Sequence, residues 1–337
     1  MKKTTLLALS LMLTATGAMA DVTVPYGEGA GQADIINYVK YPHCDDPAPT
    51  GPLSFRVIGE NVWVADSVRS KLMQFDKSGK FISEFGVFPK DEKTFFTEDV
   101  KNEKGEDIKL PVLLHTIDDF APVFDKDGKV AAFWVVDSCK SSVVKVDLEG
   151  KKLDEITDPD FGQVSRIEIG KGGHIFIADK MAKAIFTFDA DGSLQNKQAW
   201  DWNGFAVSGA EDNLYRFMYD NEAHKNVLVV SRVDGKTISG KLVAQDMFNP
   251  QVWWVDEEKG EVVVTYSPAE FKGTYNIVRI NLDGKTVAAG EVTAAIPMNR
   301  FIDNNNGEVF VGKGNYFTAP EGAFEVVPFA LPEPETK

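Results

Sequence analysis

One short pattern recurs along most of this chain and constrains its fold more than any other feature. Its clearest copy covers residues 59–86 and contains three segments, 61–66, 71–76 and 81–86, in which apolar and polar residues alternate. Alternation with a period of two is typical of β-strands that bury one face, and polar or glycine-containing links between them are typical of tight turns. Because related copies follow along the chain, the sequence predicts an all-β repeat protein.

Glycines in the predicted turns measure the length of the repeat. The turns between the third and fourth strands are spaced by 71, 42, 43 and 49 residues, and their glycines are Gly79, Gly150, Gly192, Gly235 and Gly284. Turns between the first and second strands give six units, near residues 59, 128, 172, 209, 260 and 307. Repeats of about 40–50 residues with four strands each are typical of β-propellers. The predicted fold is therefore a six-bladed β-propeller of four-stranded blades over residues 52–330.

The turns also place the first two strands of each blade. We predict the pairs 53–58 with 61–66, 120–125 with 130–137, 164–169 with 174–179, 204–208 with 213–218, 251–256 with 261–267, and 299–303 with 308–312. The sixth unit supplies only one further strand, 324–330, before the tail 331–337. Because a closed ring leaves fewer unpaired strand edges, a strand from the N-terminal segment 21–51 is expected to complete this blade. Both 22–25 and 35–40 are suitable donors.

Three of the predicted blades carry a more specific pattern, in which a strand ending in Ala-Asp precedes a short turn, a strand ending in Phe-Asp and a glycine turn. The segments are VWVADSVRSKLMQFDKSGKFISEFG in the first blade, IFIADKMAKAIFTFDADGSL in the third and, with Val136-Asp137, FWVVDSCKSSVVKVDLEGKKL in the second. They resemble NHL repeats. The later blades depart from the pattern, with Phe217-Met218, Tyr266-Ser267 and Gly312-Lys313 in place of Ala-Asp. The resemblance implies the propeller fold but no particular activity, because this fold carries unrelated functions.

The N-terminus has the three parts of a secretory signal peptide. A basic start is followed by an apolar run from 6 to 16 and by Ala18-Met19-Ala20, so cleavage is expected after Ala20. The mature protein is expected to be a soluble monomer of the periplasm or cell exterior, with no membrane insertion. A formal net charge of −15 disfavours nucleic acid and anionic lipid as partners, although acidity also serves solubility.

The chain contains two cysteines, Cys44 and Cys139. In an exported protein they are expected to form a disulfide, which would staple the start of the chain to the ring. The alternative is that they are free thiols or ligands. No C-x-x-C or C-x-x-C-H motif supports a redox site or covalent haem.

Three loops on one predicted face are longer than the repeat requires. The longest is the insertion 87–119 between the first and second blades, which is highly charged with embedded aromatic residues. The loops 219–226 and 268–274 are enlarged on the same face. Insertions into a regular repeat commonly add function, so this face is the expected surface for a protein or small-molecule ligand.

Three arginines on the predicted inner strands are candidates for ligand binding. Arg56 and Arg300 hold matching positions, three residues before Gly59 and Asp303, and Arg166 lies one step off that register. Guanidinium groups suit planar anions, so the three could ring the channel mouth and bind a carboxylate. The alternative is that they form ion pairs with Asp118, Asp119, Glu168 or Asp256.

Histidines and polar strand entrances supply candidates for a metal site. His115, at the end of the insertion, and His224, in an enlarged loop, could meet on the same face and hold zinc or copper with nearby carboxylates. Oxygen ligands at the channel mouth could come from the entrances of the first strands, where the weaker candidates are Asp118, Asp119, Asn203, Asn249 and Asn299.

Common catalytic motifs are absent from the sequence, among them G-x-S-x-G, H-E-x-x-H, the phosphate-binding loop and G-x-G-x-x-G. The favoured interpretation is an exported, non-catalytic binding or scaffold propeller without a cofactor, and no catalytic residue is assigned. The alternative is a metal-dependent hydrolase, lactonase or lyase that holds calcium or zinc at the channel mouth.

Overall fold

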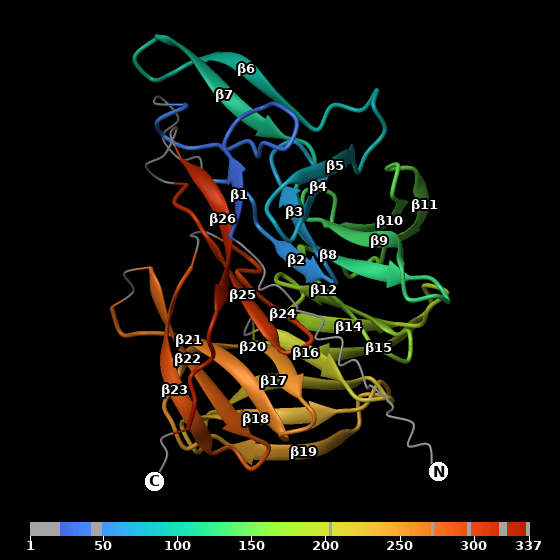
Figure 1. Cartoon of the computed structure of the whole chain (residues 1–337), viewed down its shortest axis with the longest axis vertical. Helices are drawn as coiled ribbons and strands as arrows, with labels where there is room; N and C mark the ends of the chain where they lie inside the picture. Colours follow the sequence, from blue (N-terminus) through green and yellow to red (C-terminus); the bar gives the residue numbers. More distant parts are fainter. Residues whose placement is uncertain are drawn as a thin grey trace, which may run out of the picture.

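The computed structural model describes residues 21–41, 49–201, 204–270, 273–294, 298–316 and 322–334. Within these ranges the strands form six four-stranded sheets and a separate two-stranded sheet (Figure 1). The six sheets are the blades of a ring, which confirms the predicted six-bladed β-propeller. The predicted signal peptide 1–20 lies outside the described residues. The described part contains no helix long and apolar enough to cross a membrane.

Five blades are each formed by four consecutive strands, running from the innermost strand to the outermost. Their bounds are β2 (Phe55–Ile58), β3 (Asn61–Asp66), β4 (Lys71–Asp76) and β5 (Phe81–Gly86); β8 (Ile117–Phe124), β9 (Val130–Asp137), β10 (Ser142–Asp147) and β11 (Lys152–Ile156); β12 (Val164–Ile169), β13 (Ile175–Asp179), β14 (Ala184–Phe188) and β15 (Leu194–Ala199); β16 (Phe205–Ser208), β17 (Asn213–Asp220), β18 (Lys225–Ser231) and β19 (Thr237–Leu242); β20 (Phe248–Asp256), β21 (Glu261–Ser267), β22 (Thr274–Asn281) and β23 (Thr286–Thr293).

The ring is closed by the N-terminal strand β1 (Val22–Pro25), one of the two predicted donors. It pairs antiparallel with β26 (Ala323–Phe329) and completes the sixth blade beside β25 (Glu308–Lys313) and β24 (Ile302–Asn305). The other candidate, 35–40, forms only an isolated bridge between Ile36 and Thr50. The first residues of the described chain therefore hold its last strand in place.

The inner strands β2, β8, β12, β16, β20 and β24 surround the central channel. Neighbouring inner strands contact one another, and parallel bridges join Ser54 to Arg300 and Gly204 to Val252. Because these bridges are parallel, the inner strands run in one direction and their N-terminal ends meet at one mouth of the channel. The face of the ring at this mouth also carries the insertion, and it is called the loop face below.

Local turn chemistry explains the regular blades. In the first blade Asp76 Oδ1 accepts hydrogen bonds from the backbone nitrogens of Ser78 and Lys80, at 2.9 and 3.0 Å. Gly150 in the second blade has a φ of 81°, and an added Cβ would lie 2.1 Å from the carbonyl oxygen of Gly86. Only glycine fits this turn against the first blade.

Aromatic side chains fill the spaces between adjacent blades. The buried Trp63 packs on Phe133 of the second blade, and Trp253 of the fifth blade packs on Phe301 beside the sixth, with ring centroids 4.7 Å apart in both pairs. Large aromatic contacts of this kind contribute much of the packing energy of a core. They fix the blades and hence the residues at the channel mouth.

The insertion forms a projecting hairpin of β6 (Phe95–Lys101) and β7 (Asp107–Leu113), which Figure 1 shows beyond the ring. Its base packs through Phe95 and Leu113 against the small cluster of Ile36, Tyr41 and Val68. The sequence analysis identified a long, charged insertion at this position and assigned no strands to it. The two strands were missed because most of their side chains are at least partly exposed on both faces, which removes the apolar alternation.

Five inner strands begin at residues other than those predicted, although β16 differs by a single residue. β8 and β20 begin earlier than 120 and 251, because each contains a register shift near its start that strict alternation does not anticipate. β2 and β24 begin later than 53 and 299. Residues before them instead join the neighbouring first and sixth blades, where the backbone nitrogens of Asn299 and Arg300 donate to the Leu53 carbonyl at 2.9 Å.

Candidate functional site

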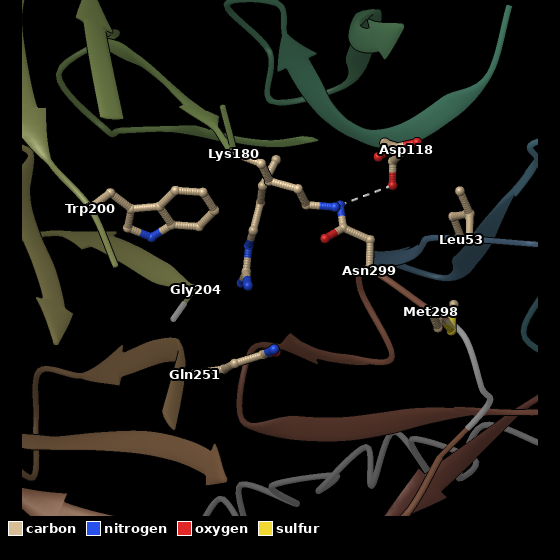
Figure 2. A pocket seen from close by; sticks show the side chains of 9 residues that line it. Leu53, Asp118, Lys180, Trp200, Gly204, Gln251, Met298 and Asn299 are labelled. Carbon is tan, nitrogen blue, oxygen red and sulfur yellow. Dashed lines mark hydrogen bonds between the residues drawn. The ribbon is translucent and has the colours of Figure 1, made fainter. Parts of the chain in front are cut away.

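A cavity of about 270 Å³ opens at the channel mouth on the loop face. All six blades or their connecting segments contribute to its wall, which is formed by Leu53, Asp118, Arg166, Lys180, Trp200, Gly204, Gln251, Met298 and Asn299. Figure 2 shows Lys180, Trp200, Gln251 and Asn299 around one central space. The wall combines positive charge, hydrogen-bonding groups and an apolar side.

Bulges at the start of two inner strands direct side chains at this mouth. The pairing register shifts between Ile117 and Asp119 in β8 and between Val164 and Arg166 in β12. Successive strand residues normally point to opposite faces, and a bulge re-aims the side chains beside it. Asp118 and Arg166 thereby line the cavity, whereas Asp119 lies in a buried cluster below it.

The buried ion-pair cluster consists of Asp119, Glu168 and two of the three candidate arginines, Arg56 and Arg300. Arg300 binds Asp119 through two hydrogen bonds of 3.0 Å and reaches Glu168 Oε1 at 2.5 Å. Arg56 lies 3.3 Å from Glu168 Oε2 and also donates to the carbonyl oxygen of Phe120 at 2.9 Å. Burial would raise the pKa of Asp119, but Arg300 and Arg56 hold it below its ordinary value. The alternative stated for these arginines, ion pairing with Asp119 and Glu168, therefore describes Arg56 and Arg300.

Arg166 differs from the other two arginines. Its side chain is fully buried, lies 3.8 Å from Glu168 Oε1 and donates a long hydrogen bond of 3.4 Å to the Val252 carbonyl. Its Nε has no hydrogen-bond partner among the described residues. The guanidinium stacks 4.6 Å from the centre of the Trp253 ring. Burial and the charge of Arg300 lower the pKa of Arg166 to about 9, so it stays charged at neutral pH.

Asp118 and Asn299 form the opposite part of the wall. Asp118 Oδ1 accepts a hydrogen bond of 2.7 Å from Ser138. Asn299 donates at 3.2 Å to the Asp118 carbonyl (Figure 2) and also donates to the Ser165 carbonyl. Burial raises the pKa of Asp118 to about 6, against the opposing effects of the Lys180 charge and the Ser138 hydrogen bond. Asp118 is thus a carboxylate that ionises close to neutral pH.

His115 lies in a different cavity, of about 320 Å³, beside the insertion. Its Nδ1 is 2.5 Å from Asp137 Oδ2, its Nε2 is 3.0 Å from Glu92 Oε1, and its ring stacks on Phe88 with centroids 4.0 Å apart. These contacts tie the start of the insertion to the second blade. His115 therefore acts first as an anchor.

His224 lines a groove of about 530 Å³ between the fourth and fifth blades. The groove brings together the enlarged loops near 219–226 and 268–274, with Tyr219 and the strongly exposed Phe248 on its wall. Next to Phe248, Asn249 has a φ of 54°, an uncommon conformation for a residue with a Cβ. His115 and His224 thus line separate cavities, and the structure does not bring them together as the sequence analysis suggested.

The remaining candidates from the sequence analysis do not line the mouth cavity or lie outside the described residues. Asn203 lies outside the described residues. Cys44 also lies outside them, so the disulfide between Cys44 and Cys139 stays a prediction. The exposed Cys139 has its sulfur 3.3 Å from Thr116 Oγ1. Asn249 sits in the bulge of β20 and is not among the nine residues that line the mouth. Within the described ranges no three His, Cys, Asp or Glu side chains are placed to hold a metal ion together.

The sequence analysis named three residues of the mouth, Asp118, Arg166 and Asn299. The polar and aromatic residues that it missed are Lys180, Trp200 and Gln251. Lys180 directly follows the Ala-Asp end of β13, and Trp200 directly follows β15, so both begin connections on the loop face. A search for polar and aromatic residues that directly follow each such strand would have found Lys180 and Trp200.

No family model matches the chain, and no curated protein matches its sequence. Among solved structures it is similar to Kuenenia stuttgartiensis hydrazine synthase, with a TM-score of 0.50 and 13% identity over 77% of this chain and 73% of that one. It is also similar to inactive virginiamycin B lyase from Staphylococcus aureus with quinupristin, with a TM-score of 0.49 and 13% identity over 94% and 97% of the two chains. At these identities the likeness concerns the fold alone, and the NHL relationship remains a resemblance.

Proposed function

We propose that the protein is an exported, non-catalytic binding propeller that takes a small molecule at the channel mouth and a protein partner on the neighbouring hairpin. Periplasmic or extracellular placement belongs to this proposal and rests on the predicted signal peptide. The alternative, a metal-dependent hydrolase, lactonase or lyase at the same mouth, makes different predictions about metal content.

The observation that carries the proposal is the convergence of all six blades on one polar cavity. Arg56, Glu168 and Arg300 lie between this cavity and a separate one of about 170 Å³ deeper in the channel, whose wall they share. Concave sites with a few convergent polar groups are the usual places for small-molecule binding. The ion-pair cluster meets the wall of the mouth cavity at Arg166, whose Nη2 lies 3.8 Å from Glu168 Oε1.

Release of a co-purified small molecule tests the mouth as the binding site. The full chain is exported, purified without unfolding, then denatured, and the released compounds are identified by mass spectrometry. Gln251→Trp fills the cavity, and Gln195→Trp makes the same change on the exposed outer strand β15. We expect the wild type and Gln195→Trp to release the same compound and Gln251→Trp to release little. Equal release from all three would contradict the proposal, and about one bound metal per chain with EDTA-sensitive unfolding would favour the enzyme alternative.

Removing the hairpin is expected to leave the propeller folded. Replacing residues 95–113 by a short Gly-Ser link exposes the cluster of Ile36, Tyr41 and Val68, so the free energy of unfolding should fall by about 1–3 kcal/mol. Urea unfolding measures this change, and cross-linking in the envelope of the source cell compares the captured proteins. Shortening only the tip, 101–107, is the matched control.

The same two variants also test whether the hairpin binds a protein partner. The full deletion should lose a cross-linked protein partner and keep the co-purified small molecule. Loss of the small molecule together with the partner would mean that the hairpin and the mouth form one site.

A further inference from the structure

We infer that the mouth cavity binds a small monocarboxylate, with its carboxylate on Arg166 and Lys180; this deepens the proposed function and rests on it. The ligand class follows from three observations on the cavity wall. The first is the buried Arg166, whose Nε has no hydrogen-bond partner among the described residues. The second is the indole nitrogen of Trp200 on the same cavity wall, which also lacks a partner there. The third is the positive net charge of the wall, which is opposite to that of the whole chain.

Arg166 is a guanidinium without a carboxylate of its own. Asp119 and Glu168 are engaged by Arg300 and Arg56 at 2.5–3.3 Å, whereas Arg166 comes no closer than 3.8 Å to Glu168 and its Nε has no partner among the described residues. A buried donor without a partner is energetically costly, so an acceptor that reaches it is bound favourably. A planar carboxylate is the group that matches a free guanidinium edge.

Trp200 supplies a second unmet donor on the same wall. Its indole is 4% exposed, and its Nε1 has no hydrogen-bond partner in the described part of the chain. An indole nitrogen can only donate, so it also requires an acceptor oxygen. Both donor nitrogens lie just behind the cavity surface, so a ligand with two or more acceptor oxygens satisfies them after a small movement of the two side chains.

Local charge selects an anion with a single negative charge. Arg166 and Lys180 give the wall two positive charges and Asp118 gives one negative charge, although the whole chain carries −15. A monoanion neutralises this wall, whereas a second carboxylate would lie near Asp118. Leu53, Met298 and the Trp200 ring offer apolar surface for the rest of the ligand, and Gln251 can bind a hydroxyl or carbonyl group.

Affinity for a monocarboxylate is expected to rise about threefold to tenfold as the pH falls from about 7.5 to 5.5. Asp118 has a pKa of about 6, so the cavity gains a positive charge as this group takes up a proton, while an ordinary carboxylic acid remains ionised. The charged groups around Asp118 are Lys180, Asp119 and Asp137, and Ser138 donates to it. Asp118→Asn should bind equally well at both pH values; an unchanged pH dependence in this variant would assign it to another group.

Calorimetric titration with matched acids and amides tests the ligand class. The probes are lactate, hexanoate and benzoate, each compared with its primary amide, on the wild-type full chain. We expect at least one acid to bind, with its amide at least about tenfold weaker. Equal binding of acid and amide, or no binding of any acid at 10 mM, would overturn the inference.

Variants then locate the bound acid. Arg166→Gln should weaken the acid by about thirtyfold or more, because a desolvated charge pair loses one partner. Lys180→Gln, at a partly exposed position, should weaken it severalfold without a change in fold, and Lys171→Gln, an exposed lysine on the opposite face, should have no effect. An unchanged affinity in Lys180→Gln and in a folded Arg166→Gln would also overturn the inference.

The outcome for the ligand class is separable from the outcome for the proposed function. If the co-purified compound has no acid group and is absent from Gln251→Trp, the inference of a carboxylate ligand is wrong but the proposal of a binding site at the mouth stands. Failure of every variant to change the released compound would remove both.

Discussion

Asp119→Asn is expected to lower the free energy of unfolding by about 3–5 kcal/mol. Asp119 is fully buried, binds Arg300 through two hydrogen bonds and accepts from the backbone nitrogen of Ile167 at 3.2 Å. An amide in its place leaves Glu168 as the remaining carboxylate in ion-pair contact with Arg300 and Arg56. The carboxyl of Asp303 also acts on both arginines, at longer range, and compensates only part of the lost charge.

Urea unfolding at pH 7 measures this loss, and the neighbouring aspartate provides the control. Asp118→Asn removes the same charge one residue away, where burial raises the pKa and disfavours the ionised form, so this variant should lose no stability at pH 7 and should gain some. The double variant Asp119→Leu with Arg300→Met should regain part of the stability, because apolar groups of similar size can replace a buried pair. Equal losses in Asp118→Asn and Asp119→Asn would show that the cluster has no special role in stability.

The architecture could be predicted from the sequence because its signals are local. The Asp76 to Gly79 turn and its later copies combine a side-chain acceptor with a glycine at positive φ, and alternation marks the strands between them. The donor of the closing strand could not be chosen by the same reasoning. Segment 22–25 alternates buried and exposed residues against its partner, whereas 35–40 places the fully buried Asn37 among its apolar residues. Only the position of β26 decides between them.

The candidate site was only partly predictable, and Arg166 shows why. The sequence analysis grouped Arg56, Arg166 and Arg300 and noted that Arg166 was one step off register. A one-residue shift turns a strand side chain to the other face, and the bulge between Val164 and Arg166 makes such a shift possible. The two arginines in matching register became ion pairs, and the one out of register reached the mouth. The positions of bulges depend on packing against the neighbouring blades, so they cannot be predicted from the sequence repeat alone.

Val24→Asp is expected to cost at least about 4 kcal/mol or to prevent folding of the full chain. Val24 is fully buried opposite Phe324 in the β1–β26 pair, and the same cluster contains Val22, Phe55 and Val326. A carboxylate there must lose its hydration without a cationic partner, and the strand that closes the ring detaches.

Thr23→Asp isolates the buried face as the cause of this loss. Thr23 is exposed on the same strand, one residue away, so the same side chain is introduced with the same change in net charge. Because Glu325 lies directly opposite Thr23 on β26, like-charge repulsion adds a small loss, and the effect on urea unfolding should stay within about 1 kcal/mol. Limited proteolysis should cut Val24→Asp in the connection between β1 and β2 under conditions that leave Thr23→Asp intact. Equal stability and equal cleavage of the two variants would mean that β1 does not close the ring in solution, and the sixth blade would then need another fourth strand to cover β26.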